Sequence, residues 1–401
     1  MTDSARQVRQ GGRPVFRQAG KEALLLAGSL LVSAVLGAAG LYFLYVPPRA
    51  EISGWRTASI LAGTIPEEEL NQLGFRGQPI HYAEGDFVVV LVGDSQVEAR
   101  PACALHWMPE RRLEAHLRAL GVPHAKVFTI GSSGYGQDQQ LLALRQYFSR
   151  FRADQVLLWE TPENDIWNNM FPTHWPANGT PKPTFRLEEG RLVGPTEALE
   201  QPIPPPPFWR RFWRQPGRDD LWEQYLPPAY TPLATYDGPV NRTWEQRESK
   251  LVNENLGNEK GHRTIFLTPR SPRMEYGLAL ARALLGELER ESLAHGARFT
   301  TMVTSRIDSE GLPVTNWEPE VYRFRGKYYR ASRRQREENI RTMNAGLDNY
   351  EIPVTAEHPG VGPADGHLNE HAVDQVMRDV AVRLAAEVLH SGSGRPPASV
   401  H

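Results

Sequence analysis

The 401-residue sequence contains a single cysteine, Cys103, which excludes an internal disulfide bond and any metal site built from several cysteines. It also lacks an excess of charge of either sign, because 45 Lys and Arg residues against 47 Asp and Glu residues leave a formal net charge of −2. Proteins that bind the backbone of nucleic acids carry a basic excess, so we predict no nucleic-acid partner. Long apolar runs are equally scarce, since the sequence has only one, residues 23–46.

This apolar run carries no charged residue and is predicted to span a membrane. As a helix it would extend about 36 Å, more than the thickness of about 30 Å of a hydrocarbon core. Basic residues gather before the run and are sparse between it and the acidic cluster at Glu67: Arg6, Arg9, Arg13, Arg17 and Lys21 precede it, and Arg49 and Arg56 follow it. The positive-inside rule therefore predicts a single-pass protein, with residues 1–22 as a cytoplasmic basic tail and the rest of the chain extracytoplasmic, in the periplasm or at the cell surface.

A cleaved signal peptide that ends near Ala39 is the main alternative to this membrane anchor. The run is longer than the apolar core of about 7–15 residues in signal peptides, so an uncleaved signal anchor over residues 23–46 is favoured. A buried core helix is disfavoured, because the run is apolar on all faces and follows a basic terminus.

After the anchor, residues 47–84 are interpreted as a stem, residues 85–390 as one globular domain, and residues 391–401 as a disordered tail rich in Gly, Ser and Pro. Within the domain, short runs rich in apolar and β-branched residues alternate with segments of helical pattern. The predicted strands are Phe87–Val92, Ala125–Ile130, Gln155–Trp159, Phe299–Val303 and Glu351–Thr355. The predicted helices include Pro109–Leu120, Gln137–Phe151, Arg273–His295 and His371–Leu389. This alternation indicates an α/β domain with a parallel sheet.

The alternation breaks over residues 166–262, which hold six of the ten tryptophans and the proline run 204–207. A structureless loop of this length is improbable inside a compact domain, so we interpret the segment as an insertion that packs on the core or covers the site as a lid. Packing is favoured, since large aromatic side chains usually serve it. The basic segment 322–336 is interpreted as a solvated face rather than a surface for anionic polysaccharide or lipid.

Four short blocks combine residue types that suit acyl transfer. Gly93-Asp94-Ser95, Gly131–Gly136 and Glu163-Asn164-Asp165 each follow a predicted strand, and Asp365-Gly366-His367 precedes the last helix. Because ligands bind at the carboxyl ends of parallel strands, these blocks are expected to meet at one edge of the sheet. A histidine can deprotonate a serine there, and a carboxylate can orient the histidine. The glycine spacing G-x-x-G-x-G differs from the dinucleotide pattern G-x-G-x-x-G, so no nucleotide site is predicted.

In this order the four blocks resemble those of the SGNH (GDSL-type) hydrolase superfamily, over about residues 85–390. The resemblance implies a three-layer α/β/α, flavodoxin-like parallel sheet, here with the insertion and a transmembrane helix added. Three positions depart from the family pattern: Thr129 replaces an asparagine, Pro162 replaces a glycine, and only Gly366 separates the acid from the histidine. The shorter acid–histidine spacing is similar to that of membrane-associated members, including polysaccharide O-acetyl esterases and acetyltransferases.

The resemblance also implies a role for each site residue. Ser95 is the implied nucleophile, His367 the general base, and Asp365 the carboxylate that orients it. The implied oxyanion hole consists of the backbone N–H groups of Ser95 and Gly134 and the side-chain amide of Asn164, and the implied supporting residues are Asp94 and Asp165. No cofactor and no catalytic metal are expected.

The function predicted from these features is that of a membrane-anchored serine esterase that hydrolyses an acyl ester, with an O-acetyl group on a glycan as the candidate substrate. An O-acyltransferase that modifies an extracytoplasmic polysaccharide is the alternative. A catalytically silent binding or assembly module is a third interpretation, because a fold alone does not fix a function.

Overall fold

The computed structural model describes residues 13–44, 65–99, 103–173, 182–195, 222–241, 255–305, 320–354, 360–362 and 365–391. Helix α1 (Arg13–Leu44) is a unit by itself, and the remaining described residues form one domain. Within the described chain, α1 holds the one stretch, Lys21–Gly40, that is long and apolar enough to cross a membrane. By length and composition this is consistent with a membrane anchor or a signal sequence, and the orientation of the anchor stays a prediction.

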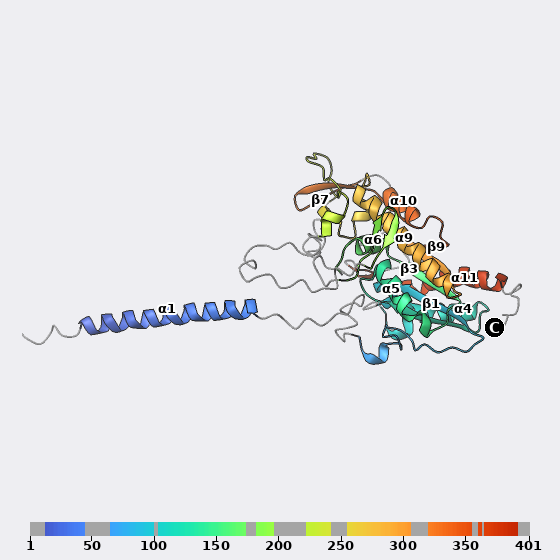
Figure 1. Ribbon diagram of the computed structural model, residues 1–401, viewed down its shortest axis with the longest axis horizontal. Helices are drawn as coiled ribbons and strands as arrows, with labels where there is room; N and C mark the ends of the chain where they lie inside the picture. Colours follow the sequence, from blue (N-terminus) through green and yellow to red (C-terminus); the bar gives the residue numbers. More distant parts are fainter. Residues whose placement is uncertain are drawn as a thin grey trace, which may run out of the picture. The chain divides into compact units, whose positions relative to one another are not determined.

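The domain is built on a five-stranded sheet in which every neighbouring pair of strands is parallel (Figure 1). The strands run in the order β2-β1-β3-β6-β9, which is the flavodoxin-like order. Their bounds are β1 Phe87–Gly93, β2 Ala125–Gly131, β3 Gln155–Glu160, β6 Arg298–Ser305 and β9 Asn349–Pro353. The predicted α/β fold class is therefore confirmed, and each predicted strand is found within two residues of its expected ends.

Helices cover both faces of this sheet, as the alternating side chains of β1 show. Val88, Val90 and Val92 pack into one core with α5, α6, α9 and α10, whereas Val89 and Leu91 pack into a second core with α3, α4 and α11. A strand with both faces buried reads as a continuous apolar run, which is why β1 is recognisable in the sequence. The helices are α3 Ser95–Glu98, α4 Pro109–Ala119, α5 Gln137–Tyr147, α6 Pro162–Met170, α9 Pro272–Ala294, α10 Arg333–Met343 and α11 Glu370–Ser391.

The smaller elements lie in the connections between these strands and helices. Three antiparallel pairs are β4 Arg186–Glu188 with β5 Arg191–Val193, β7 Glu320–Phe324 with β8 Lys327–Ala331, and β10 Gly360–Gly362 with β11 Asp365–Leu368. The 3-10 turns are η1 Glu67–Glu69, η2 Leu105–Trp107, η3 Phe148–Arg150, η6 Glu223–Tyr225, η7 Leu256–Asn258 and η8 Thr264–Phe266.

The stem predicted over residues 47–84 is wrong for its second half, because the structure packs residues 65–84 against the domain. Phe75 is fully buried. Asn71 Nδ2 donates to the backbone oxygen of Thr129 at 2.9 Å, and Thr129 Oγ1 donates to the backbone oxygen of Arg76 at 2.6 Å. The sequence suggests a helical stretch around residues 66–73, but the structure has only the 3-10 turn Glu67–Glu69 there, and the rest of the segment packs through irregular backbone that has no periodic pattern.

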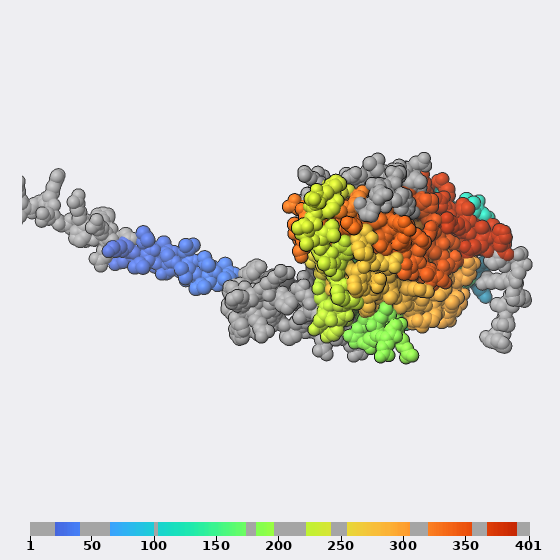
Figure 2. Space-filling model, turned by 90° about the horizontal axis from the view of Figure 1, so that it is seen from above, coloured from blue at the N-terminus to red at the C-terminus, as the bar shows by residue number. Residues whose placement is uncertain are grey.

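The described part of the insertion also packs on the domain. Its first residues, 166–170, belong to α6, where Trp167 is buried, which corrects the predicted boundary. Trp222 is buried too and donates its indole N–H to the backbone oxygen of Met170 at 2.8 Å. Figure 2 shows residues 222–241 (yellow-green) as a ridge on the surface beside the orange segment that contains α9. For these two tryptophans the structure confirms packing; the other four of the insertion lie outside the described residues.

The basic segment predicted as a solvated face forms the β7–β8 hairpin and the start of α10. Arg323, Arg325 and Lys327 are exposed, as predicted for a solvated face. The prediction is wrong for Arg336, which is buried on α10. Phe324 also packs inward, into a small cluster with residues of the insertion.

Candidate active site

The first three sequence blocks meet at one edge of the sheet, as predicted. In the register of the sheet, Gly93 at the end of β1 pairs with Gly131 at the end of β2 and with Trp159 in β3. A Cβ atom at Gly93 would lie 2.5 Å from Val97 Cγ2, and one at Gly131 would lie 2.9 Å from the backbone oxygen of Gly93. Both positions therefore require glycine so that α3, which begins at Ser95, can sit directly on the strand ends.

Asp94 fixes the start of α3 and ties it to the third block. Its buried carboxylate accepts from the backbone N–H of Gln96 at 2.9 Å, and so it caps the helix whose first residue is Ser95. The same carboxylate accepts from Thr161 Oγ1 at 3.1 Å and from Asn164 Nδ2 at 3.0 Å. Ser95 itself is 9% exposed, with its backbone N–H in the first turn of the helix.

The histidine block reaches the same place from β11. Burial raises the pKa of the Asp94 carboxyl group, and the charge of His367 is among the influences that lower it. The neighbouring Leu368 N–H donates to Gln96 Oε1 at 3.4 Å. The structure thus places Asn164 on Asp94 beside Ser95, and places β11, which carries His367, in contact with the start of α3. Asp365 starts β11, but its side chain lies outside the described side chains, so its orienting role stays a prediction.

The second block is held in place by Glu98, the last residue of α3. Its carboxylate accepts from the backbone N–H of Ser133 at 3.0 Å and from Ser132 Oγ at 3.3 Å, and it also bonds Ser133 Oγ. The next residue, Gly134, has φ +78°, a conformation that favours glycine. A Cβ atom there would meet nothing within 4 Å, so the positive φ, and not a lack of space, is what favours glycine at this position.

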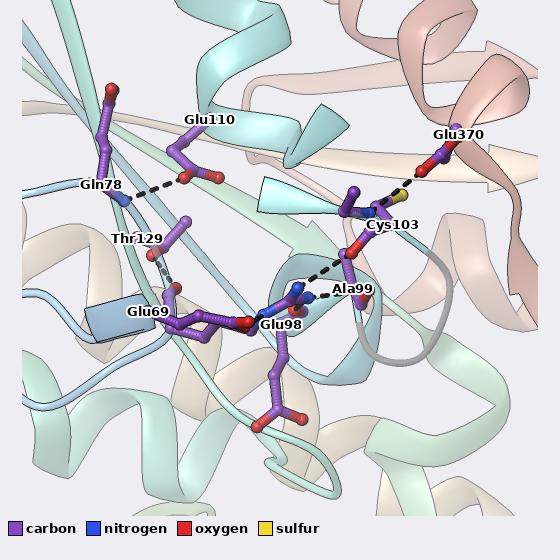
Figure 3. Close-up of polar contacts among 10 residues, drawn as sticks. Glu69, Gln78, Glu98, Ala99, Cys103, Glu110, Thr129 and Glu370 are labelled. Carbon is purple, nitrogen blue, oxygen red and sulfur yellow. Dashed lines mark hydrogen bonds and ion pairs between the residues drawn. The ribbon is translucent and has the colours of Figure 1, made fainter. Parts of the chain in front are cut away.

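Arg76 is a buried positioning residue that the sequence does not reveal, because it lies in the segment predicted as stem. Its guanidinium donates to the backbone oxygens of Glu98 at 2.9 Å, Ala99 at 3.0 Å and Cys103 at 2.9 Å, and to Glu69 Oε2 at 2.7 Å. Figure 3 shows Glu69, Glu98, Ala99 and Cys103 converging on this point. The arginine therefore binds the carbonyl oxygens of Glu98 and Ala99 at the end of α3, and the oxygen of Ala99 also accepts from the backbone N–H of Cys103 at 2.9 Å.

A second buried arginine holds the third block. Arg336 on α10 donates from Nε to Glu163 Oε1 at 3.0 Å, and the side chains of both residues are at most 5% exposed. Glu163 immediately precedes Asn164. An ion pair of this kind is costly to break on one side only, so it constrains the backbone that carries Asn164.

Asn164 keeps donor capacity for a reacting oxygen atom. Its amide nitrogen carries two N–H groups, of which the bond to Asp94 uses one. The side chain is partly exposed although its neighbours Glu163 and Asp165 are buried. Asp165 supports the block, since its carboxylate accepts from the backbone N–H of Thr161 at 2.8 Å. Burial, followed by the charges of Asp94 and Glu160, raises the pKa of Asp165 well above its ordinary value.

Glu160 at the end of β3 makes the stability of the domain depend on pH. Burial raises the pKa of its carboxyl group to about 8, whereas in the unfolded chain it is close to the ordinary 4.5. Between these values the folded state keeps a proton that the unfolded state loses, so the free energy of unfolding falls as pH rises, by at most about 1.4 kcal/mol per pH unit. We expect Glu160→Gln to flatten the profile from pH 4.5 to 8 in denaturant titrations.

The exposed carboxylate Glu84 supplies the matched control, since Glu84→Gln should leave the slope unchanged. Parallel profiles for wild type and Glu160→Gln would show that Glu160 is not the group that titrates.

Within the described ranges, no cluster of three or more His, Cys, Asp or Glu side chains is arranged to hold a metal ion.

No protein-family model matches the sequence, and no curated protein matches it. Similar solved structures include a protein described as an arylesterase from Agrobacterium tumefaciens, with 12% identity and a TM-score of 0.36 over 75% of this chain and 99% of that chain. A protein described as a GDSL-like lipase from Parabacteroides merdae has 11% identity and a TM-score of 0.33 over 77% and 98% of the two chains. A carbohydrate acetylesterase from Sinorhizobium meliloti has 11% identity and a TM-score of 0.34 over 75% and 100%.

Identities and TM-scores of this size do not establish an activity for this chain, so we infer its function from the side chains of the site.

Proposed function

We propose that this protein is a membrane-anchored serine esterase that hydrolyses an acyl ester, with an O-acetyl ester as the candidate substrate. The proposal is supported by Ser95 in the first turn of α3, by Asn164 on the neighbouring Asp94, and by the contact of Leu368 on β11, next to His367, with Gln96 of the same helix. A serine at the start of a helix, a histidine on an adjoining strand and an amide donor are the residue types that nucleophilic acyl transfer needs.

In the proposed reaction, Ser95 Oγ attacks the ester carbonyl carbon while His367 accepts its proton. The tetrahedral oxyanion is stabilised by the backbone N–H groups of Ser95 and Gly134 and by the amide of Asn164; losing one such donor costs about 10²–10³ in rate. The intermediate collapses, and His367 returns the proton to the departing alcohol, which leaves an acyl-serine. A water molecule, deprotonated by His367, then attacks the acyl carbon, and the carboxylic acid leaves as Ser95 regains its proton. Asp365 is the proposed partner that orients His367.

Cys103 is the other side chain that could act as a nucleophile near this edge, but its environment opposes this role. It is buried, and burial first, then the charge of Glu370, raises the pKa of its thiol to about 12. A thiol with such a pKa carries almost no thiolate at neutral pH, and the thiolate is the nucleophilic form. The proposal therefore assigns the covalent step to Ser95.

The acyltransferase alternative differs only in what attacks the acyl-serine, a sugar hydroxyl in place of water. The single residue between Asp365 and His367, which is similar to the pattern of membrane-associated family members, is the observation that favours it. Product analysis separates the two: the full chain in detergent micelles is given p-nitrophenyl acetate with and without an oligosaccharide acceptor. The esterase proposal predicts free acetate in both cases, whereas acetylated oligosaccharide as the main product would favour the transferase. Release of neither product would leave the silent binding module as the remaining interpretation.

A further inference from the structure

Trp107 differs from the other tryptophans that the structure describes. Trp159, Trp167 and Trp222 are buried, whereas Trp107 keeps part of its ring exposed. It ends η2, directly before α4, and α4 connects the carboxyl end of β1 to the amino end of β2. Trp107 therefore lies at the same edge of the sheet as Ser95.

Contacts on α4 and α11 fix the orientation of this indole ring. The Arg112 guanidinium carbon lies 4.9 Å from the centre of the Trp107 ring, a cation–π contact. Arg112 is itself held by Asp374 on α11, whose Oδ1 accepts from Arg112 Nε at 2.6 Å and lies 2.7 Å from His116 Nε2. A ring held in this way loses little conformational freedom when a ligand binds, so it is a preorganised binding surface.

Two exposed histidines flank the ring, and one of them leads directly to the catalytic block. The His371 ring lies 5.7 Å from the Trp107 ring at an interplanar angle of 69°, and the His106 ring lies 5.9 Å from it at 49°. His371 is four positions after His367, so their Cα atoms are at most about 15 Å apart. Glu370, the first residue of α11, links this helix to the start of η2, since its Oε1 accepts from the backbone N–H of Ala104 at 3.0 Å. Figure 3 shows Glu370 reaching from α11 toward the backbone beside Cys103.

We infer that Trp107, His106 and His371 form a binding subsite for a pyranose ring of an acylated glycan. A sugar ring has an apolar face of C–H groups that packs on an aromatic ring, and hydroxyl groups around its rim that bond to polar side chains. The indole supplies the apolar surface, and the two imidazoles supply donors and acceptors at its edge. This inference rests on the proposed esterase function and names the class of molecule that carries the ester.

The location of the subsite suits such a substrate, because Trp107 and Ser95 lie at the same edge of the sheet, where the proposed esterase would bind its ester. The described tryptophans of the insertion cannot provide this surface, since Trp167 and Trp222 are buried.

Direct binding tests the subsite without any need for turnover. The full chain carrying Ser95→Ala, in detergent micelles, is titrated with a neutral xylo-oligosaccharide and with an anionic oligomannuronate, and binding is followed by saturation-transfer NMR. Whichever oligosaccharide binds the Ser95→Ala chain, the double variant Ser95→Ala/Trp107→Ala should bind it at least about tenfold more weakly. This is the typical loss when a central tryptophan is removed from an interface. Trp107→Phe, which keeps an aromatic face, should lose less.

Tyr225→Ala is the matched control, because Tyr225 is 55% exposed and has Arg186 5.9 Å from its ring, but lies on η6, outside the four blocks. It should leave binding unchanged. The inference is overturned if neither oligosaccharide binds the Ser95→Ala chain, if Trp107→Ala binds as well as its parent, or if Tyr225→Ala weakens binding equally.

A kinetic comparison keeps this inference separate from the proposed function. For the chain with an active serine, Trp107→Ala should lower kcat/KM for an acetylated oligosaccharide at least about tenfold more than for p-nitrophenyl acetate, mainly through KM. Equal losses for the two esters would overturn the subsite and leave the esterase proposal standing. If Ser95→Ala lost both activities and Trp107→Ala lost neither, the subsite would likewise be overturned and the esterase proposal would stand.

Discussion

Replacing Ser95 with alanine is expected to lower the turnover of p-nitrophenyl acetate by the full chain about 10³-fold or more, which is the usual cost of removing a catalytic serine. The physical reason is that Ser95 Oγ is the atom that forms the bond to the acyl carbon. The fold should survive, because the contacts that hold α3 run through Asp94 and Arg76 and not through the serine hydroxyl. Turnover is measured in detergent micelles, with thermal unfolding monitored in parallel.

Cys103→Ser is the matched control for this prediction, since it replaces the thiol that was weighed against Ser95 as the nucleophile. Because the thiol is buried with a pKa raised to about 12, the variant should keep wild-type turnover. More than a tenth of the wild-type rate in Ser95→Ala, or loss of turnover in Cys103→Ser with an intact fold, would contradict the assignment of the nucleophile.

Replacing His367 with alanine should have an effect of similar size, about 10³-fold or more on kcat, because the serine then has no base to accept its proton. The thermal midpoint should change little, since the imidazole is partly exposed and lies on the short strand β11 rather than in either core. Steady-state kinetics with p-nitrophenyl acetate measure the loss.

His124→Ala tests whether such a loss is specific, because His124 precedes β2 at the opposite end of the strand and its side chain is 77% exposed. This variant should retain wild-type kcat. If His367→Ala kept most of the activity, another residue would have to be the base.

The fold and most of the site residues could be predicted because they depend on local patterns. Strands buried on both faces, such as β1, are continuous apolar runs, and a parallel sheet brings the residues that follow its strands to one edge. The closeness of Ser95 and Asn164 follows from the pairing of β1 with β3, because each residue comes shortly after one of these strands. Their catalytic roles came from the family resemblance, and they stay predictions until the variants are measured.

The residues that hold the site in place could not be predicted, because their partners are remote in sequence. Arg336 and Glu163 are 173 residues apart, and a basic residue in a charged run gives no sign that it will be buried. Arg76 lies in irregular backbone that packs by individual hydrogen bonds rather than through a periodic apolar face. Only the three-dimensional arrangement identifies such pairs.

The central claim, that Ser95 is an activated nucleophile, is tested most directly by a fluorophosphonate probe, which reacts covalently with activated serines. The full-length chain in detergent micelles is incubated with the probe, and the modified peptide is identified by mass spectrometry. Our account predicts one adduct on Ser95, formed by the wild type and by Cys103→Ser and absent from Ser95→Ala. An unlabelled wild-type chain, or an adduct that persists in Ser95→Ala, would contradict it.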